Sequence, residues 1–246
     1  MKLIDIRGFV LKEQTYKEND KIVWVLCENI GKVSILAKNA KKMKNSKFIL
    51  TQPFSLVQFT LIKGKSFYYI QDGSLIKNVN FINNEDVIFY LSYFFELLDI
   101  CFQDKDILDT NFFKIIMKTF LVLESNSMDK DLMMRIFEFK LLNKLGCSIE
   151  FEKCYYCSQN LKESIEYFDF TFQSVVCNSC SKLKEFKIEN RIINIMRFLN
   201  KIDMRNIPRL SVTNNDMKLI FDFNKILLDQ NLIRMPNSIK FLGGYE

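Results

Sequence analysis

The sequence predicts an α+β fold in which a small β-barrel precedes a mainly helical region. Apolar and polar residues alternate through much of the first eighty positions, the apolar spacing becomes helical near Asn80, and two Cys-x-x-Cys pairs follow within the helical region. The chain has 246 residues, of which 48% are hydrophobic and 26% charged, as is typical of globular proteins. We therefore expect two domains, residues 1–80 and residues 81–246.

Short alternating segments separated by turn residues predict five or six strands in the first domain. The clearest is 54–62, which alternates strictly and is followed by the turn Lys63-Gly64-Lys65. This number of strands in about eighty residues is the size of an OB-fold barrel. The predicted strands are 4–11, 22–27, 33–37, 54–62 and 67–71.

Helical spacing predicts five helices in the second domain. The third of these begins near Met128 or Asp129 and is expected to end with Gly146 in the C′ position. A small hairpin is expected between the two cysteine pairs, and a loop or short helix over residues 232–246. The five predicted helices are 85–102, 111–124, 128–146, 189–200 and 216–230.

Two Cys-x-x-Cys pairs, Cys154 with Cys157 and Cys177 with Cys180, are separated by nineteen residues. Each pair places two thiolates on one tight turn, and four thiolates close the tetrahedron of a structural Zn²⁺ site with no open position. We therefore predict a zinc-binding insertion at about residues 150–182. Two disulfides, or four buried free thiols, are the alternatives. The other cysteines are expected to be small buried residues: Cys27, Cys101 and Cys147.

The sequence favours a soluble cytoplasmic protein over a secreted or membrane protein. This use of cysteine fits a reducing compartment. The N-terminus has an acid at Asp5 and no long apolar region, unlike a signal peptide. The most apolar run, 87–100, is interrupted by Glu96 and Asp99 and falls short of the ~20 residues that a spanning helix needs.

Nothing in the sequence predicts catalytic residues. The chain contains no histidine, which removes the commonest general base, and it has no glycine-rich phosphate-binding loop. A nuclease would need clustered carboxylates for Mg²⁺, and pairs such as Asp104 and Asp106 lack a metal-binding context. We therefore expect a protein that is not an enzyme.

The basic residues are concentrated near the N-terminus. Residues 1–80 contain fourteen Lys and Arg against six Asp and Glu, whereas residues 81–246 contain twenty-one against twenty-three. Six lysines and no acid lie in residues 32–47, and such a segment can neutralise phosphates and release counterions. We interpret it as a nucleic-acid-binding loop; the alternative is a solvated loop that only maintains solubility. Its lysines are Lys32, Lys38, Lys41, Lys42, Lys44 and Lys47.

Other cations and aromatic residues of the first domain add candidates to this interface. Lys63 and Lys65 form a basic turn, whereas Arg7, Lys12 and Lys21 are each more typical of an ordinary surface. OB-folds stack bases on exposed aromatic rings, and alternation places Tyr68 on the opposite face from its two aromatic neighbours. The aromatic candidates are Trp24, Phe67, Tyr68 and Tyr69.

Many aromatic residues also gather in the predicted helices. A groove for a protein partner is one interpretation, and dense packing in the core is the favoured one. The residues are Phe81, Phe89, Tyr90, Tyr93, Phe94, Phe95, Phe112 and Phe113.

Three segments resemble the bacterial RecO family of recombination and repair proteins. They are G-F-V-L-K-E-Q-T-Y-K-E-N-D-K-I-V from Gly8, G-K-V-S-I-L-A-K-N-A-K-K from Gly31 and S-K-F-I-L-T-Q-P-F-S from Ser46. The helical middle and the two cysteine pairs fall where that family keeps its zinc-binding insertion. The chain departs from the family at Asn39, where glycine is usual; asparagine tolerates a positive φ better than most residues.

The resemblance implies a non-enzymatic, nucleoid-associated protein that binds single- and double-stranded DNA and anneals complementary strands. It also implies that the protein helps, together with RecR, to load RecA onto strands coated by single-strand-binding protein (SSB), whose acidic C-terminal tail it contacts. By position, the resemblance implies zinc ligands at Cys154, Cys157, Cys177 and Cys180, and DNA contacts at Lys38, Lys41, Lys42, Lys44 and Lys47. The residues themselves add Arg7, Lys63, Lys65 and Tyr68 as candidate DNA contacts. A zinc-stabilised adaptor that binds only proteins is the alternative function.

Overall fold

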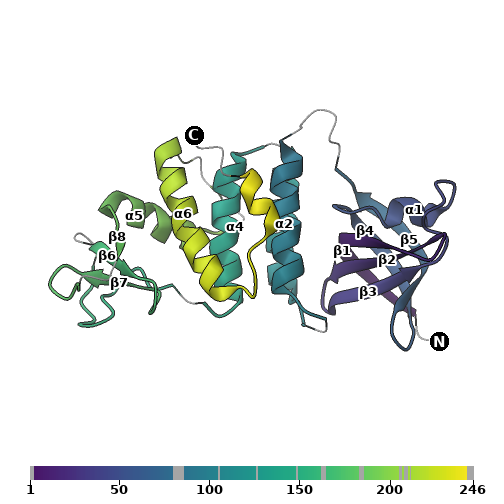
Figure 1. The fold of residues 1–246 in the computed structure, drawn as a ribbon, viewed down its shortest axis with the longest axis horizontal. Coiled ribbons are helices and arrows are strands. Elements are labelled where there is room, and N and C mark those ends of the chain that lie inside the picture. The colour runs from purple at the N-terminus through teal and green to yellow at the C-terminus, as the bar shows by residue number, and fades with distance from the viewer. Residues whose placement is uncertain are drawn as a thin grey trace. The chain divides into compact units, whose positions relative to one another are not determined.

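The computed structural model describes residues 3–79, 86–104, 106–125, 127–147, 149–161, 165–182, 186–204, 207, 210 and 212–242 (Figure 1). The chain forms two compact units. The first comprises Met1–Ser125 together with Pro236–Leu242, and the second lies within Asn126–Met235.

The first unit begins with a closed, OB-like barrel of five strands. The strands are β1 (Leu3–Tyr16), β2 (Asp20–Cys27), β3 (Gly31–Ala37), β4 (Leu56–Lys63) and β5 (Tyr68–Lys77). They follow each other around the barrel in the order β1-β2-β3-β5-β4, and β1 closes the circle on β4. All pairs are antiparallel except β3 with β5. The α+β fold with an N-terminal barrel that the sequence predicts is confirmed.

Alternation along the strands separates the inside of the barrel from its outside. Val23, Val25, Ile35 and Phe59 are fully buried in the barrel core, whereas Trp24 and Ser34, one step out of phase, are only half-buried. Strand β1 pairs with β4 from Leu3 to Phe9 and with β2 from Gly8 to Tyr16. Its register with β2 shifts between Val10 and Lys12, just after the pairing with β4 ends.

The outer face of β1 is covered by two helices of the same unit, α2 (Val87–Cys101) and α3 (Thr110–Ser125). The ring of Phe9 lies 5.9 Å from that of Phe95, 5.6 Å from Phe113 and 5.2 Å from Phe120, measured between centroids. These edge-to-face and tilted contacts add specific attraction to apolar burial. The first two helices therefore share an apolar core with the outer face of the barrel, separate from the core inside the barrel.

Most of the aromatic residues singled out in the helices lie in this core. Tyr90 is only half-buried, and Phe89 is 41% exposed, with its ring 5.5 Å from that of Phe241. Phe241 belongs to the 3₁₀ helix η1 (Asn237–Phe241), within the segment predicted as a loop or short helix. Phe81 lies outside the described residues, as does residue 85, the first of a predicted helix. Dense packing is confirmed for Tyr93, Phe94, Phe95, Phe112 and Phe113, which are buried.

One short helix has no counterpart among the elements that the sequence predicts. Helix α1 (Ser46–Leu50) follows the basic loop; Asn45 caps it by accepting a 2.9 Å hydrogen bond from the backbone N–H of Lys47. Leu50 enters the barrel core. The helix is too short for an apolar period to be recognised in the sequence.

The second unit contains three helices and a small sheet. The helices are α4 (Lys130–Lys144), α5 (Asn190–Lys201) and α6 (Asn214–Asn231). The sheet is formed by β6 (Ile165–Asp169), β7 (Ser174–Cys177) and β8 (Phe186–Lys187), in the order β7-β6-β8. Asp129 caps α4, and Gly146 has a φ of 86°, as expected for a C′ residue.

The three cysteines outside the two Cys-x-x-Cys pairs differ in burial, which corrects the prediction that all are buried. Cys27 is fully buried, but Cys101 and Cys147 are only half-buried, and the Cys147 thiol lies 3.0 Å from Oδ1 of Asn231. Cys147 therefore makes a polar contact with Asn231, at the end of α6, and does not serve only as a small apolar residue.

Among the helices that the structure describes, none has the length and apolar character needed to cross a membrane.

Candidate nucleic-acid interface and candidate metal centre

The basic loop is held on the barrel by its backbone while its side chains extend outward. The buried methyl of Ala40 lies in the barrel core, and the backbone N–H of Lys41 donates to Asn19 O at 3.1 Å. Two further turns are closed by hydrogen bonds from Lys42 N–H to Asn39 O at 3.2 Å and from Asn45 N–H to Lys42 O at 2.9 Å. Four lysines of the loop are exposed: Lys38, Lys41, Lys42 and Lys44.

Asn39 adopts the left-handed conformation that its glycine-like position requires. Its φ is 57°, and its backbone N–H donates a 2.9 Å hydrogen bond to Oδ1 of Asp20. Asparagine reaches this region at modest cost. The departure from the family pattern therefore preserves the turn.

The structure divides the six lysines of residues 32–47 into different environments. Lys32 belongs to strand β3 and is buried, with Nζ 2.6 Å from Oδ1 of Asp99. Placing Lys32 in the binding loop was therefore wrong, because an acid 67 positions further along the chain neutralises it. Lys47 lies in α1 and is half-buried. The four exposed lysines remain as the cationic part of the loop.

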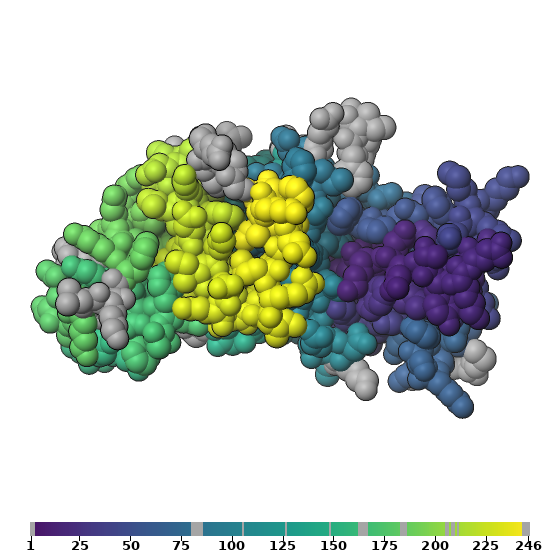
Figure 2. Space-filling model, in the orientation of Figure 1, coloured from purple at the N-terminus to yellow at the C-terminus, as the bar shows by residue number. Residues whose placement is uncertain are grey.

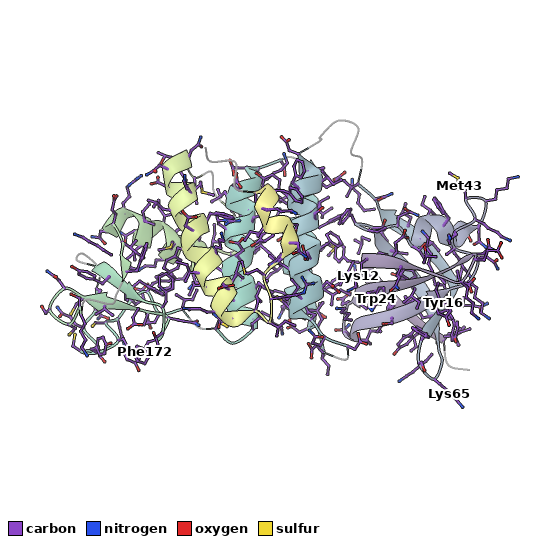
Figure 3. All side chains as sticks on the ribbon, in the orientation of Figure 1. Lys12, Tyr16, Trp24, Met43, Lys65 and Phe172 are labelled. Carbon is purple, nitrogen blue, oxygen red and sulfur yellow. The ribbon has the colours of Figure 1, made fainter. Side chains whose placement is uncertain are left out.

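The other candidate cations also differ in their availability. Nη2 of Arg7 lies 2.6 Å from Oε2 of Glu28, so an acid partly neutralises this exposed guanidinium. For Lys63 and Lys65, both exposed, no ion pair occurs among the described residues. Figure 3 shows Met43, at the tip of the basic loop, and Lys65 at opposite edges of the barrel. The loop and the basic turn are therefore two separate cationic features.

Tyr68 is half-buried. It shares its parity with the buried Ile70 and packs partly against the barrel core. What remains accessible of Tyr68 lines a cleft of about 310 Å³ between β3 and the β4–β5 hairpin. The sequence could not distinguish the two parities of this strand, because apolar residues occupy both.

The four predicted metal ligands come together. The sulfur atoms of Cys154, Cys157, Cys177 and Cys180 all lie within 4.8 Å of one another. Sγ of Cys157 lies 3.8 Å from Sγ of Cys177, which is the edge of a tetrahedron with metal–sulfur bonds of about 2.3 Å. All four cysteines are free, so neither pair forms a disulfide. The arrangement can hold a metal ion.

Backbone hydrogen bonds form the two turns that carry the sulfur atoms. Ser158 N–H donates to Cys154 O at 2.9 Å, and Cys180 N–H donates to Cys177 O at 3.0 Å. The first turn is tied to the hairpin by a 3.0 Å hydrogen bond from Tyr155 N–H to Val175 O. The ligands are therefore preorganised by the sheet.

The electrostatics of the cluster favour a bound cation. Burial raises the pKa of Cys154, but hydrogen bonds from the backbone N–H groups of Cys177, Cys157 and Tyr156 outweigh it and lower that pKa to about 6. Hydrogen bonds with the thiols of Cys177 and Cys157 raise the pKa of Cys180 to about 12. One thiolate thus opposes ionisation of its neighbours, and a divalent cation relieves this repulsion. The donor set, four sulfurs without an open position, suits structural Zn²⁺.

An exposed group of aromatic rings beside the cysteines was not identified from the sequence. The rings of Tyr155 and Phe172 stack with centroids 4.1 Å apart and planes 12° apart, and Tyr156 packs edge-on against Tyr155. All three residues are at least 40% exposed. Figure 3 labels Phe172 near the hairpin end of the small sheet. Phe172 lies sixteen positions beyond Tyr156 in the chain, and only the hairpin fold brings them together.

Comparison with known proteins agrees with this architecture. The family model for the N-terminal part of recombination protein O matches residues 1–79, and the model for its C-terminal part matches residues 86–238. The DNA repair protein RecO of Clostridium novyi (strain NT) is 33% identical over 244 residues, covering 99% of this chain and 94% of its own length. That of Clostridium perfringens (strain 13 / Type A) is 31% identical over 243 residues, covering 98% of each.

The fold and the matches together define a DNA repair and recombination protein built from an OB-like barrel and a helical region with a cysteine cluster. The chain belongs to the RecO family.

Proposed function

We propose that this chain is a non-enzymatic recombination mediator that binds single- and double-stranded DNA and anneals complementary strands. With RecR, it helps to load RecA onto single strands coated by SSB, whose acidic C-terminal tail it contacts. Its role in DNA repair follows from the family; the binding and partner functions are inferences that rest on the family resemblance and on the barrel surface.

The observation that carries this proposal is the basic loop on the barrel. Four exposed lysines lie within seven residues, and backbone hydrogen bonds to Asn19 and Asp20 hold the loop in place. Lysines that contact phosphates release condensed counterions, which drives binding that is largely independent of sequence. Two strands held on one cationic surface repel each other less, so base pairing between them becomes easier.

The test is a salt titration of DNA binding and annealing. Replacing Lys41, Lys42 and Lys44 by glutamate is expected to abolish binding at physiological salt and to flatten the salt dependence of any binding that remains at low salt. The matched control replaces three exposed helix lysines, Lys114, Lys118 and Lys225, by glutamate, which changes the net charge equally. If both triple variants lose affinity to the same extent, the loop has no specific role and only the total charge matters.

The cysteine cluster has a structural role in this proposal. We infer that it binds one Zn²⁺ and that the metal fixes the two cysteine turns against the β6–β7 hairpin. The chain's own contribution is the preorganised backbone that presents four thiolates to one point. The sequence contains no histidine to serve as a general base, and we infer that mediation involves no catalysis. Strand cleavage by the pure protein with added Mg²⁺ would contradict this.

The aromatic rings of the second unit favour a second candidate function, that of a zinc-stabilised adaptor. Exposed aromatic residues are enriched where proteins meet, and Tyr155, Tyr156 and Phe172 form one contiguous group. Such an adaptor would not need the basic loop. A mobility-shift assay with the pure protein distinguishes the two functions, because only the mediator shifts DNA without a partner.

A further inference from the structure

A cleft opens in the wall of the barrel where β3 diverges from the β4–β5 hairpin. The parallel pairing aligns Ile35 with Tyr68 and Leu36 with Tyr69, toward the C-terminal end of β3. Nearer its start, β3 is instead bridged at Lys32 by Asp104, which follows α2. Three separate segments therefore enclose a volume of about 310 Å³.

The lining combines apolar surface with cations and hydrogen-bonding groups. Val33, Phe67 and Tyr68 provide apolar and aromatic surface, and Ser34 provides a hydroxyl. Lys63 and Lys65 are exposed at the hairpin, where Figure 2 shows the blue chain protruding from the barrel. The ammonium group of Lys32 is committed to Asp99, so the lysines that can meet a ligand here are those of the hairpin.

The hairpin that forms one side of the cleft has a fixed shape. Gly64 N–H donates to Phe67 O at 2.9 Å and closes the turn. A Cβ atom at position 64 would lie 2.5 Å from a ring carbon of Tyr69, so this ring packs directly on the glycine. The cleft therefore exists before any ligand binds, which reduces the entropic cost of binding.

We propose that this cleft receives one unstacked nucleobase of single-stranded DNA, while Lys63 and Lys65 hold the adjoining phosphates. The inference rests on the proposed DNA binding and assigns a specific site to it. About 310 Å³ is at the small end of ligand sites, which suits a single base better than a longer segment. The aromatic rings offer apolar contact to any base, and Ser34 and Asp104 offer hydrogen bonds to its edge. A paired base inside a duplex cannot enter, so the cleft favours single strands.

The experiment uses an oligonucleotide that carries 2-aminopurine, whose fluorescence is weak when the base is stacked and rises when it is unstacked. The full-length protein is expected to raise this fluorescence on a single strand and to leave it unchanged in a duplex. Ser34→Phe fills the cleft without changing a charge, and it is expected to remove the rise and to lower single-strand affinity about tenfold. Ser74→Phe, at an exposed position of β5 outside the cleft, is the matched control and is expected to behave as the wild type.

Two further variants keep the proposal testable if Ser34→Phe fails to fold. Phe67→Ala removes one aromatic side of the cleft and is expected to reduce the fluorescence rise. The double change Lys63→Gln and Lys65→Gln is expected to weaken single-strand binding more than duplex binding. If the wild-type protein binds single strands with the expected salt dependence but does not raise the fluorescence of 2-aminopurine, the cleft proposal is overturned while the proposed function stands. If the wild type binds no DNA, both fail.

Discussion

Nζ of Lys32 lies 2.6 Å from Oδ1 of Asp99, and the same amino group donates a 2.8 Å hydrogen bond to the Asp99 backbone carbonyl. Both side chains are nearly buried, at 8% and 11% exposed. Oδ2 of Asp99 pairs with Lys12 at 2.6 Å, and Lys12 also lies over the ring of Trp24. One carboxylate of α2 thus neutralises two cations of the barrel and ties the helix to it.

The first prediction concerns the loss of this carboxylate. Asp99→Asn leaves Lys32 buried without a counter-charge, and we expect the first unit to lose about 3 kcal/mol of stability. Trp24 is the only tryptophan in the chain and lies in the barrel, so urea unfolding followed by its fluorescence reports on this unit. Glu28→Gln, which breaks the more exposed pair with Arg7, is the control and is expected to cost less than about 1 kcal/mol. Equal losses of unfolding free energy in the two variants would show that the buried Lys32–Asp99 pair stabilises the unit no more than the exposed Arg7–Glu28 pair does.

The second prediction concerns pH. Burial raises the pKa of Asp99, but the hydrogen bonds and charges of Lys12 and Lys32 outweigh it and hold the pKa below its usual value. A carboxyl group whose pKa is lower in the folded state stabilises that state above its unfolded pKa, and the contribution disappears as pH falls through the folded pKa. We therefore expect the stability of the first unit to fall below about pH 4. Asp99→Asn should remove part of that slope; an identical slope would exclude Asp99 as its source.

The third prediction concerns the metal. Replacing Cys154 and Cys157 by serine should reduce bound zinc from about one ion per chain to near zero and lower the unfolding temperature of the second unit. Cys147→Ser is a matched control outside the cluster, because serine can keep the contact with Oδ1 of Asn231. Metal content by elemental analysis and unfolding by circular dichroism are the measurements. Wild-type protein that unfolds identically with and without a chelator would disprove a structural role for the metal.

The local parts of the fold could be predicted from the sequence because they depend on local signals. Strand β4 alternates between buried and half-buried residues from Val57 to Ile62, and the cysteine spacing is enough to predict that four sulfur atoms meet. The signals that bound α4 are likewise local: Asp129 caps its start, and Gly146 follows its end with a positive φ. In each case the deciding residues lie within one element or in one short motif.

What could not be predicted depends on pairs that are distant in the sequence. Lys32 looks like part of a basic loop until the fold brings Asp99 to it. The cleft beside β3 depends on Asp104 bridging to Lys32, and no spacing in the sequence indicates this. The sequence does not decide whether Tyr68 faces the barrel core or the outside, because the hydrophobic pattern fits either face of the strand. A charge count therefore overestimates the cationic surface that is free to contact a ligand.

The fourth prediction concerns a buried ion pair in the second unit. Nη2 of Arg135 lies 2.8 Å from Oε1 of Glu138, with side chains 1% and 0% exposed, and Asn224 donates a 2.8 Å hydrogen bond to Glu138 Oε2. Arg135→Met removes a charged partner from a fully buried carboxylate and should cost about 3–5 kcal/mol. Adding Glu138→Gln removes that charge and keeps an acceptor for Asn224, so the double variant should recover most of the loss. Chemical unfolding followed by circular dichroism measures this cycle, and a double variant no more stable than the single one would contradict it.

The fifth prediction concerns the geometry of the basic loop. Asn39 has a φ of 57°, where a β-branched side chain meets the backbone, so Asn39→Val should cost about 1–2 kcal/mol or force the loop to change shape. No charge changes, yet the exposed lysines on either side would move, and we expect weaker DNA binding with an unchanged net charge. Asn39→Gly keeps the conformation accessible and serves as the control, with affinity close to that of the wild type. Fluorescence anisotropy with a labelled single strand measures both. If the valine variant folds and binds as tightly as the glycine variant, the shape of the loop is irrelevant and the lysines act only as a diffuse charge.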